Sequence, residues 1–154
     1  HITARQFTEM GVPVTLIVDN AAHRYLNDAD HVLVGADSIA ADGAVVNKIG
    51  TAGLAVSARD RGVPITVAAQ TIKLDPSTLA GHAVEIETRD EAEVIDPAER
   101  GKLGDVEVAN PAFDVTPPRH VDAIVTERGQ FPPESIVVLM RELWGEAPEE
   151  PWAP

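Results

Sequence analysis

Three short apolar runs alternate with segments of helical pattern in the first half of the chain. The runs are VTLIV at residues 14–18, HVLVGA at 31–36 and ITVAA at 65–69. Continuous apolar character of this kind is typical of strands that are buried on both faces of a parallel sheet. Because helical segments separate the runs, the pattern predicts an α/β domain with right-handed crossovers.

The remaining segments are assigned by apolar spacing, capping residues and turn residues. Four expected helices span residues 2–10, about 20–27, about 119–126 and 133–143. A fifth opens at Asn47 or Thr51 and ends near residue 59. A loop is expected between the second strand and the third helix, where Asp37, Asp42, Gly43, Asn47 and Lys48 lie. A further short strand is expected at 106–108, and the polar region 79–105 is predicted to be a solvated loop or edge.

The length and composition fit one domain. The chain has 154 residues, of which 44% are hydrophobic, so it can bury a core. We expect the domain to span residues 1–144 and the last ten residues, 145–154, to form an acidic, proline-rich, disordered tail. No apolar run is long enough for a membrane span, and no basic-then-apolar signal segment begins the chain. We therefore expect a cytoplasmic protein with no membrane partner.

The charge balance is strongly acidic. Twelve Lys and Arg face 25 Asp and Glu, a formal net charge of −13. This surface repels a phosphate backbone, so we expect no nucleic-acid partner. Acidic surplus with only three lysines favours a protein from a high-salt cytoplasm over an ordinary acidic mesophilic one. The chain contains no cysteine, which excludes disulfides and cysteine nucleophiles within it.

The candidate ligand site lies at the carboxyl ends of the predicted strands, where open α/β sheets bind their ligands. Asp37 follows the second strand, Lys48 lies in the loop after it, and Lys73 follows the third strand. Lysine suits phosphate, and a helix beginning near Gly50 would offer free N–H groups to an anion. On pattern alone, a turn carboxylate and two solvated lysines explain these residues as well.

Asp37 is the candidate proton carrier. It could cap a turn, but its small neighbours leave room for a ligand, and an enclosed carboxylate there could serve as general acid or base. Asp42 and Gly43 form a turn signal. The motif NPAFDVTPP is expected to be a constrained turn, with ligand or subunit contact as the alternative.

The sequence offers no signal for a metal or a nucleotide cofactor. Four histidines, His23, His31, His82 and His120, lack ligand spacing, and each is expected to be structural. There is no glycine-rich dinucleotide fingerprint and no P-loop. We therefore expect no cofactor.

Three ordered motifs resemble one known superfamily over nearly the whole chain. They are VGADSIAADGAVVNKIGT, VPITVAAQTIKLDP and NPAFDVTPPRHVDAIVTERGQFPPES. The superfamily contains ribose-1,5-bisphosphate isomerases, methylthioribose-1-phosphate isomerases and the alpha, beta and delta subunits of translation initiation factor 2B. TIKL is similar to the ribose-bisphosphate isomerase and initiation-factor branches, and GAD with NKIGT favours the catalytic branches.

The resemblance implies a Rossmann-like, three-layer carboxy-terminal domain that lacks a helical amino-terminal domain and the first strand of its sheet. It implies an aldose–ketose isomerase that converts ribose 1,5-bisphosphate to ribulose 1,5-bisphosphate in archaeal nucleotide (AMP) degradation. Asp37 matches the acid/base aspartate, and Asn47, Lys48 and Lys73 match substrate-binding positions. A regulatory subunit like those of initiation factor 2B is the alternative.

The resemblance also implies features outside this sequence. The family's catalytic cysteine belongs to an amino-terminal half, so the chain alone is expected to be inactive, and the family assembles as homo-oligomers. Asp42 departs from the asparagine that relatives commonly carry. The assignment therefore requires that this carboxylate point away from a phosphorylated ligand.

Overall fold

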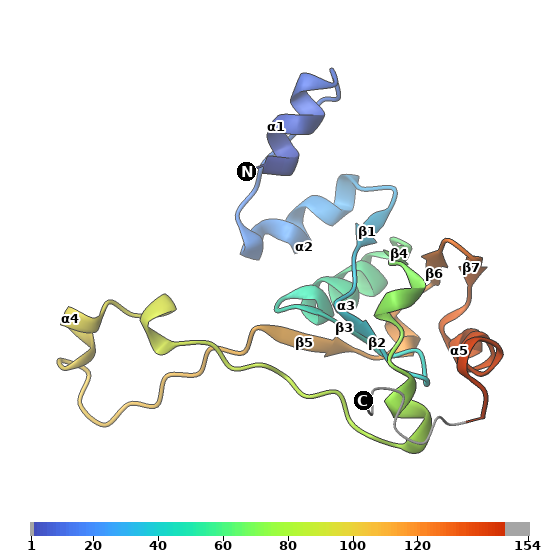
Figure 1. The fold of residues 1–154 in the computed structure, drawn as a ribbon. Helices are drawn as coiled ribbons and strands as arrows, with labels where there is room; N and C mark the ends of the chain where they lie inside the picture. Colours follow the sequence, from blue (N-terminus) through green and yellow to red (C-terminus); the bar gives the residue numbers. More distant parts are fainter. Residues whose placement is uncertain (1, 147–154) are drawn as a thin grey trace.

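Four strands form a twisted sheet at the centre of the molecule (Figure 1). The computed structural model describes residues 2–146. The strands are β1 (Val32–Val34), β4 (Ile65–Ala68), β6 (Ala123–Thr126) and β7 (Gly129–Phe131), in the order β1-β4-β6-β7. The first three run parallel and β7 pairs with β6 in the antiparallel sense. The predicted α/β class with a mostly parallel sheet is confirmed.

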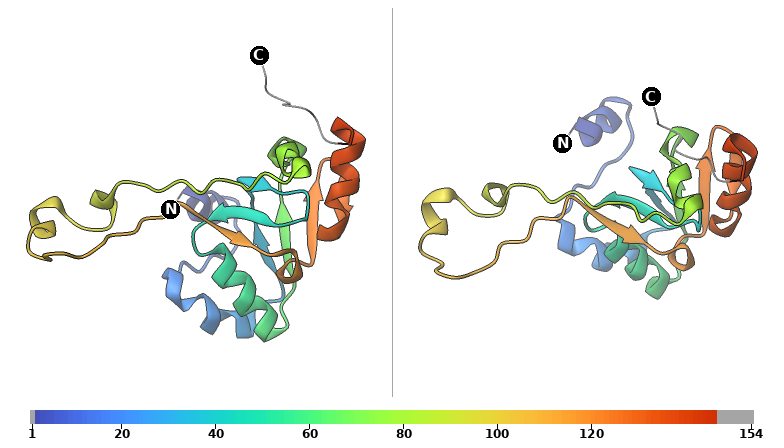
Figure 2. Two further views of the ribbon diagram at one scale, coloured as in Figure 1. Left: turned by 90° about the horizontal axis from the view of Figure 1, so that it is seen from below. Right: turned by 60° about the horizontal axis from the view of Figure 1, so that its bottom comes forward.

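Helices cover both faces of this sheet (Figure 2). One face is covered by α2 (Ala22–Tyr25) and α3 (Thr51–Arg61), and the other by α5 (Ile136–Trp144). One core cluster lies on each side. The cluster beside α3 contains Leu26, Val32, Ala55, Ala58, Val63 and Ile65. The cluster beside α5 contains Ile39, Val45, Val67, Ile124, Ile136, Leu139 and Met140, among others.

Two further helices and seven 3-10 helices complete the helical elements of the described residues. The helices are α1 (Ile2–Glu9) and α4 (Pro97–Arg100). The 3-10 helices are η1 (Asp19–Ala21), η2 (Leu26–Asp28), η3 (Thr71–Lys73), η4 (Pro76–Ala80), η5 (Glu91–Glu93), η6 (Pro118–His120) and η7 (Pro133–Ser135). The predicted helices at 2–10, 20–27, 51–59 and 133–143 are confirmed within the usual uncertainty at helix ends. The helix α3 opens at Thr51, not Asn47.

A second, antiparallel sheet replaces the loop predicted around residues 37–48. It contains β2 (Ser38–Ile39), β3 (Val45–Lys48) and β5 (Phe113–Thr116). The loop prediction was wrong because Asp42 and Gly43 make a tight hairpin turn in place of a long connection. The motif NPAFDVTPP was likewise predicted as a turn, but its central residues form β5, which pairs with β3.

The strand predicted at residues 14–18 is absent from the described part of the chain. Val14, Leu16 and Val18 are 40%, 66% and 74% exposed. A strand needs a neighbour for its backbone N–H and C=O groups, and no described strand pairs with this segment. The prediction of a strand at 14–18 was therefore wrong, because an apolar composition does not show whether a pairing partner is present.

The strand at residues 31–36 was predicted to be buried on both faces, which is wrong. It forms β1 at the edge of the sheet, and Leu33 is 69% exposed.

The helix predicted at about 119–126 was also wrong. The chain forms η6 and then β6, which lies between β4 and β7. A short apolar run such as VDAIV does not distinguish a buried strand from a buried helix by periodicity. The short strand expected at 106–108 is absent as well, since these residues form no strand.

Residues 82–110 project from the body as an arm (Figures 1 and 2). Its two limbs are joined at the base, where Arg89 N donates to Asn110 O at 2.8 Å and Ala112 N donates to Glu87 O at 2.9 Å. Surface ion pairs fold its tip, and none of residues 82–110 is fully buried. The prediction that residues 79–105 form a solvated region is confirmed, although η5, α4 and the end of η4 form short helical turns in it.

Within residues 2–146, no helix is both long and apolar enough to cross a membrane. Most of the predicted tail, residues 147–154, lies outside the described residues.

Candidate functional site

The candidate site is built around the short strand β2. On one side β2 pairs with β3, and on the other Ile39 forms a bridge with Leu74, the residue after Lys73. Asp75 N also donates to Ile39 O at 2.9 Å. β2 therefore brings together the segment after β1, the end of β3 and the turn after β4, which carry the residues predicted from the sequence.

Asp37 links β1 to β2 at the carboxyl end of the parallel sheet. Its backbone N donates to Val46 O at 2.9 Å, which places it beside Asn47, the next residue of β3. The side chain of Asp37 is exposed in the described structure. The enclosed, apolar surroundings considered for this carboxylate are therefore not formed by the described residues.

Asn47 and Lys48 end β3, and Thr51 links them to α3. Asn47 Nδ2 donates to Thr51 Oγ1 at 3.0 Å, and Thr51 Oγ1 donates to the backbone O of Lys48 at 2.7 Å. Thr51 is buried, Asn47 is half-buried and Lys48 is exposed. The turn therefore fixes the Asn47 amide and leaves the Lys48 ammonium in solvent, where it can meet an anion.

Asp114 occupies the amino terminus of α3. Its Oδ2 accepts from Gly50 N at 2.8 Å and its Oδ1 from Ala52 N at 3.1 Å. A carboxylate is a favourable helix cap because it takes free N–H groups at the positive end of the helix dipole. The expectation that these N–H groups are free for an external anion was therefore wrong, since the protein supplies the anion itself.

Lys73 lies in η3, and Glu127 holds that turn. Thr71 donates to the Glu127 carboxylate through its backbone N, at 3.0 and 3.3 Å, and through its hydroxyl. The hydrogen bond from the Thr71 hydroxyl, followed by backbone N–H groups and the Arg128 charge, lowers the pKa of Glu127 below its ordinary value. Because Glu127 follows β6 and Thr71 follows β4, this contact joins neighbouring strand ends beside Lys73.

Asp42 lies in the turn at the other end of the β2–β3 hairpin from Asp37. Its Oδ1 accepts from Ala44 N at 2.9 Å, and Ala40 N donates to Ala44 O across the turn. The carboxylate is therefore used in turn formation. Asp42 also borders a mainly alanine- and valine-lined hollow of about 350 Å³, which lies beside Thr78 and His82.

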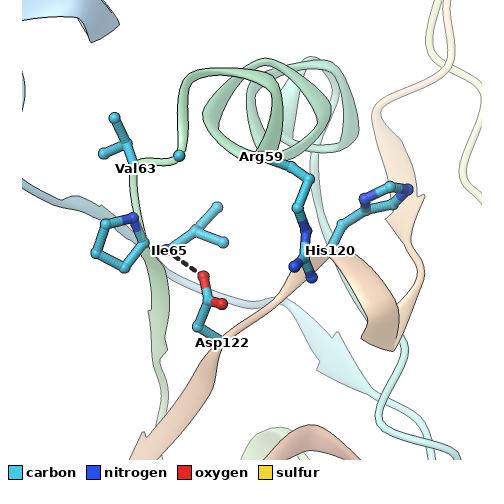
Figure 3. A pocket seen from close by; sticks show the side chains of 7 residues that line it. Arg59, Val63, Ile65, His120 and Asp122 are labelled. Atoms are coloured by element: carbon cyan, nitrogen blue, oxygen red, sulfur yellow. Dashed lines mark hydrogen bonds between the residues drawn. The ribbon is translucent and has the colours of Figure 1, made fainter.

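A smaller pocket of about 170 Å³ lies at the opposite, amino-terminal edge of the central sheet (Figure 3). Asp122 Oδ2 accepts from Ile65 N at 2.8 Å, and Arg59 donates to the backbone O of Arg119. The pocket lies beside the carboxyl end of α3, where the helix dipole repels anions. With Asp122 also present, it is a poor phosphate site, and its polar groups mainly satisfy the local backbone.

The described residues contain no cluster of three metal-ligating side chains. His31 Nε2 lies 2.9 Å from Thr66 Oγ1, and His23 contacts Arg61. In the described part of the chain, the Nδ1 atom of His120 is buried without a hydrogen-bond partner.

A mostly parallel sheet with helices on both faces defines an α/β domain of the doubly wound kind, and Asp37 and the turn of Lys73 lie at the carboxyl edge of this sheet. The chain belongs to the Initiation factor 2 subunit family, whose model matches residues 1–133.

Several curated relatives match almost the whole chain. A ribose 1,5-bisphosphate isomerase of Haloferax volcanii is 72% identical over 99% of this chain and 47% of its own length. The protein of the same name from Haloterrigena turkmenica is 69% identical over 99% of this chain and 49% of its own length. The chain therefore spans about half the length of the curated relatives it matches.

Solved structures share the fold. A 5-methylthioribose 1-phosphate isomerase of Pyrococcus horikoshii superposes with a TM-score of 0.76 at 36% identity, covering 93% of this chain and 41% of that one. The delta subunit of translation initiation factor eIF-2B from A. fulgidus gives 0.75 at 37% identity, covering 89% and 41%. The proteins that resemble this chain are therefore named partly as isomerases and partly as initiation-factor subunits.

Proposed function

We propose that this chain is the carboxy-terminal domain of an aldose–ketose isomerase that converts ribose 1,5-bisphosphate to ribulose 1,5-bisphosphate. The observation that carries the proposal is the 72% identity, over 99% of the chain, to a protein named for this activity. The geometry around β2 supports it, since Asp37, Asn47 and the turn of Lys73 are all tied to this strand or its neighbour.

In the proposed reaction the enzyme opens the aldose and moves hydrogen between C1 and C2. Substrate and product are isomers, so no oxidant or reductant enters the balance. Asp37 acts as general acid and base and carries the proton that is exchanged during this transfer. Lys48 and Lys73 bind phosphate oxygens as point charges, and Asn47 binds the sugar.

The test is an assay of the complete gene product with ribose 1,5-bisphosphate, followed by ³¹P and ¹³C NMR. The proposal expects ribulose 1,5-bisphosphate to accumulate to equilibrium without an added cofactor. Methylthioribose 1-phosphate serves as the matched competitor and is expected to turn over at least about tenfold less efficiently, since it lacks the second phosphate. Failure to isomerise ribose 1,5-bisphosphate under high-salt conditions would contradict the proposal.

A second candidate is a regulatory subunit that acts by protein contacts in translation initiation. The family description and the names of structural neighbours favour it, including translation initiation factor eIF-2B of Pyrococcus horikoshii, at 35% identity and a TM-score of 0.73 over 87% of this chain and 45% of that one. This candidate predicts tight binding to a translation factor and no isomerase activity. The same assay, combined with a pull-down from the native organism, separates the two.

The cellular setting is part of the proposal. We place the reaction in nucleotide (AMP) degradation in the cytoplasm of a halophilic archaeon and expect a homo-oligomer. The net charge of −13 and the relatives from Haloferax and Haloterrigena support the halophilic assignment. Analytical ultracentrifugation of the complete gene product at high salt tests the oligomeric state.

A further inference from the structure

The hydrogen-bond network of Thr51 fixes the orientation of the Asn47 amide. A hydroxyl group has one hydrogen to donate. The backbone O of Lys48 can only accept, and it lies 2.7 Å from Thr51 Oγ1, so the Thr51 hydrogen is committed to it. The Asn47 atom 3.0 Å from the same Oγ1 must then be the donor, Nδ2. An amide orientation is usually ambiguous, but here the neighbouring contacts determine it.

This orientation leaves Asn47 Oδ1 as an open acceptor. Within residues 2–146, no hydrogen bond engages Oδ1, while Nδ2 is held by Thr51. Asn47 is half-buried and lies beside exposed Asp37. A carbonyl oxygen binds a hydroxyl donor and repels a phosphate oxygen, which is also an acceptor. The edge next to Asp37 is therefore suited to a hydroxyl, and the lysines are suited to phosphate.

The turn that carries this network is held from several sides. Thr51 is 8% exposed and is one of only two buried polar residues in the described chain. Asp114 pairs with Asn47 in the β3–β5 register and binds the backbone N of Gly50 and Ala52. Asp114 therefore holds the backbone of the turn together with the Thr51 hydroxyl, and the hydroxyl in addition orients Asn47.

We propose that Thr51 is a positioning residue that turns Asn47 Oδ1 toward a ribose hydroxyl and so makes the site specific for a hydroxylated sugar phosphate. The proposal rests on the proposed function, because it assigns the group that Asn47 recognises in the same site. Thr51 acts through Asn47 and does not touch the ligand. Lys48 and Lys73 remain the residues assigned to phosphate binding.

The first test is a double-mutant cycle in the complete gene product, with Thr51→Val, Thr51→Ser and Asn47→Leu. Thr51→Val keeps the shape but removes the hydroxyl, and we expect kcat/KM to fall about fivefold to tenfold, mainly through KM. Thr51→Ser restores the hydroxyl and stays within about twofold of the wild type. In the Asn47→Leu background, Thr51→Val causes no further loss. An equal loss in both backgrounds would show a merely structural role and overturn the proposal.

The second test reads hydroxyl recognition directly. Dissociation constants are measured for ribose 1,5-bisphosphate and for its 2-deoxy and 3-deoxy analogues. The wild type is expected to bind one analogue about tenfold more weakly than the ribose ligand, and Asn47→Leu and Thr51→Val lose most of this discrimination. Discrimination that is unchanged in both variants contradicts the proposal. This measurement requires binding but no turnover. A protein without isomerase activity would therefore contradict the proposed function, and the role of Thr51 could still be tested.

A third measurement uses the wild-type protein, in case a variant fails to fold or the sugar phosphate does not bind. In ¹⁵N-edited NMR, the hydrogen of Asn47 Nδ2 that is bonded to Thr51 is expected to exchange with water more slowly than its geminal partner. Equal, fast exchange of both hydrogens would overturn the orientation assigned to Asn47.

Discussion

Glu127 shows how a single exposed side chain organises the turn that carries Lys73. Its carboxylate accepts hydrogen bonds from the backbone N and the hydroxyl of Thr71. These donors favour the charged form, so the pKa of Glu127 is lower in the folded protein than in the unfolded chain. Protonation must therefore weaken the turn and, with it, the placement of Lys73.

We predict that Glu127→Gln lowers the melting temperature in a pH-dependent manner. A lowered folded pKa stabilises the protein fully above the unfolded pKa, and the effect is lost as pH falls through the folded pKa. The difference in melting temperature between wild type and Glu127→Gln should thus be constant near neutral pH and vanish in acid. Calorimetry across the acid range measures it. Glu142→Gln, an exposed carboxylate on α5, is the control, and an equal pH dependence in it would refute the prediction.

At the residue scale, sequence predicted the ligand-edge groups but not the residues that position them. Asp37, Lys48 and Lys73 were singled out because each was expected at or just after the end of a strand, which is a local signal, whereas Asn47 came from the family resemblance. Asp114 binds Gly50 from 64 positions away, and Glu127 binds Thr71 from 56 positions away. Such contacts depend on which strands lie side by side, so nothing local in a single sequence shows them. Thr51 was noted only as a possible helix start.

The β2–β3 hairpin is the element on which the candidate site depends, and its turn packs tightly against η7. Gly43 has φ +84°, and a Cβ there would lie 2.3 Å from Pro133 O and 2.6 Å from Pro133 C. Both are backbone atoms, so neither can move aside cheaply. Only glycine fits this position, because the left-handed conformation and the close approach both exclude a side chain.

We predict that Gly43→Ala destabilises the protein by about 2–4 kcal/mol, from backbone strain and steric overlap. Gly53→Ala is the matched control, since Gly53 lies inside α3 with open space around its Cβ position. That change should stabilise the protein by about 0.5–1 kcal/mol through helix propensity. Denaturant unfolding measures both. Equal effects of the two substitutions would contradict the role of the turn.

At the element scale, helices with clear ends were predictable, and so were the strands β1 and β4, which turn residues bound in the sequence, but the other short strands were not. The apolar stripe of α5 and the glycine and proline after α3 gave correct helices. The segments that became β5 and β6 were misassigned, because a run of four or five residues has no measurable period. The prediction of a strand at 14–18 was wrong for another reason: a strand needs a neighbouring strand to pair with, and the apolar pattern does not show whether one is present.

The whole molecule carries a formal net charge of −13, and its arm concentrates acidic residues in solvent. All the ion pairs seen in the described residues are at least partly exposed, so they contribute little compared with the general repulsion. Salt screens this repulsion. The stability of the folded molecule should therefore increase with ionic strength.

We predict that the melting temperature rises by several degrees or more between about 0.1 M and 2 M KCl. Replacing Glu85, Glu87, Asp105 and Glu107 of the arm with their amides should reduce the rise. Scanning calorimetry at matched protein concentration measures both. A melting temperature that is flat or falls with salt would show that repulsion is not the dominant electrostatic effect.

The claim that Asp37 carries the proton in an isomerase site is tested most directly by the turnover number of Asp37→Asn in the complete gene product. Asparagine keeps the size of the side chain and removes the acid/base group. The account predicts a fall in kcat of about 10²–10⁴-fold, with the melting temperature and the affinity for ribose 1,5-bisphosphate close to those of the wild type. A variant that folds, binds the substrate and turns over at the normal rate would contradict it.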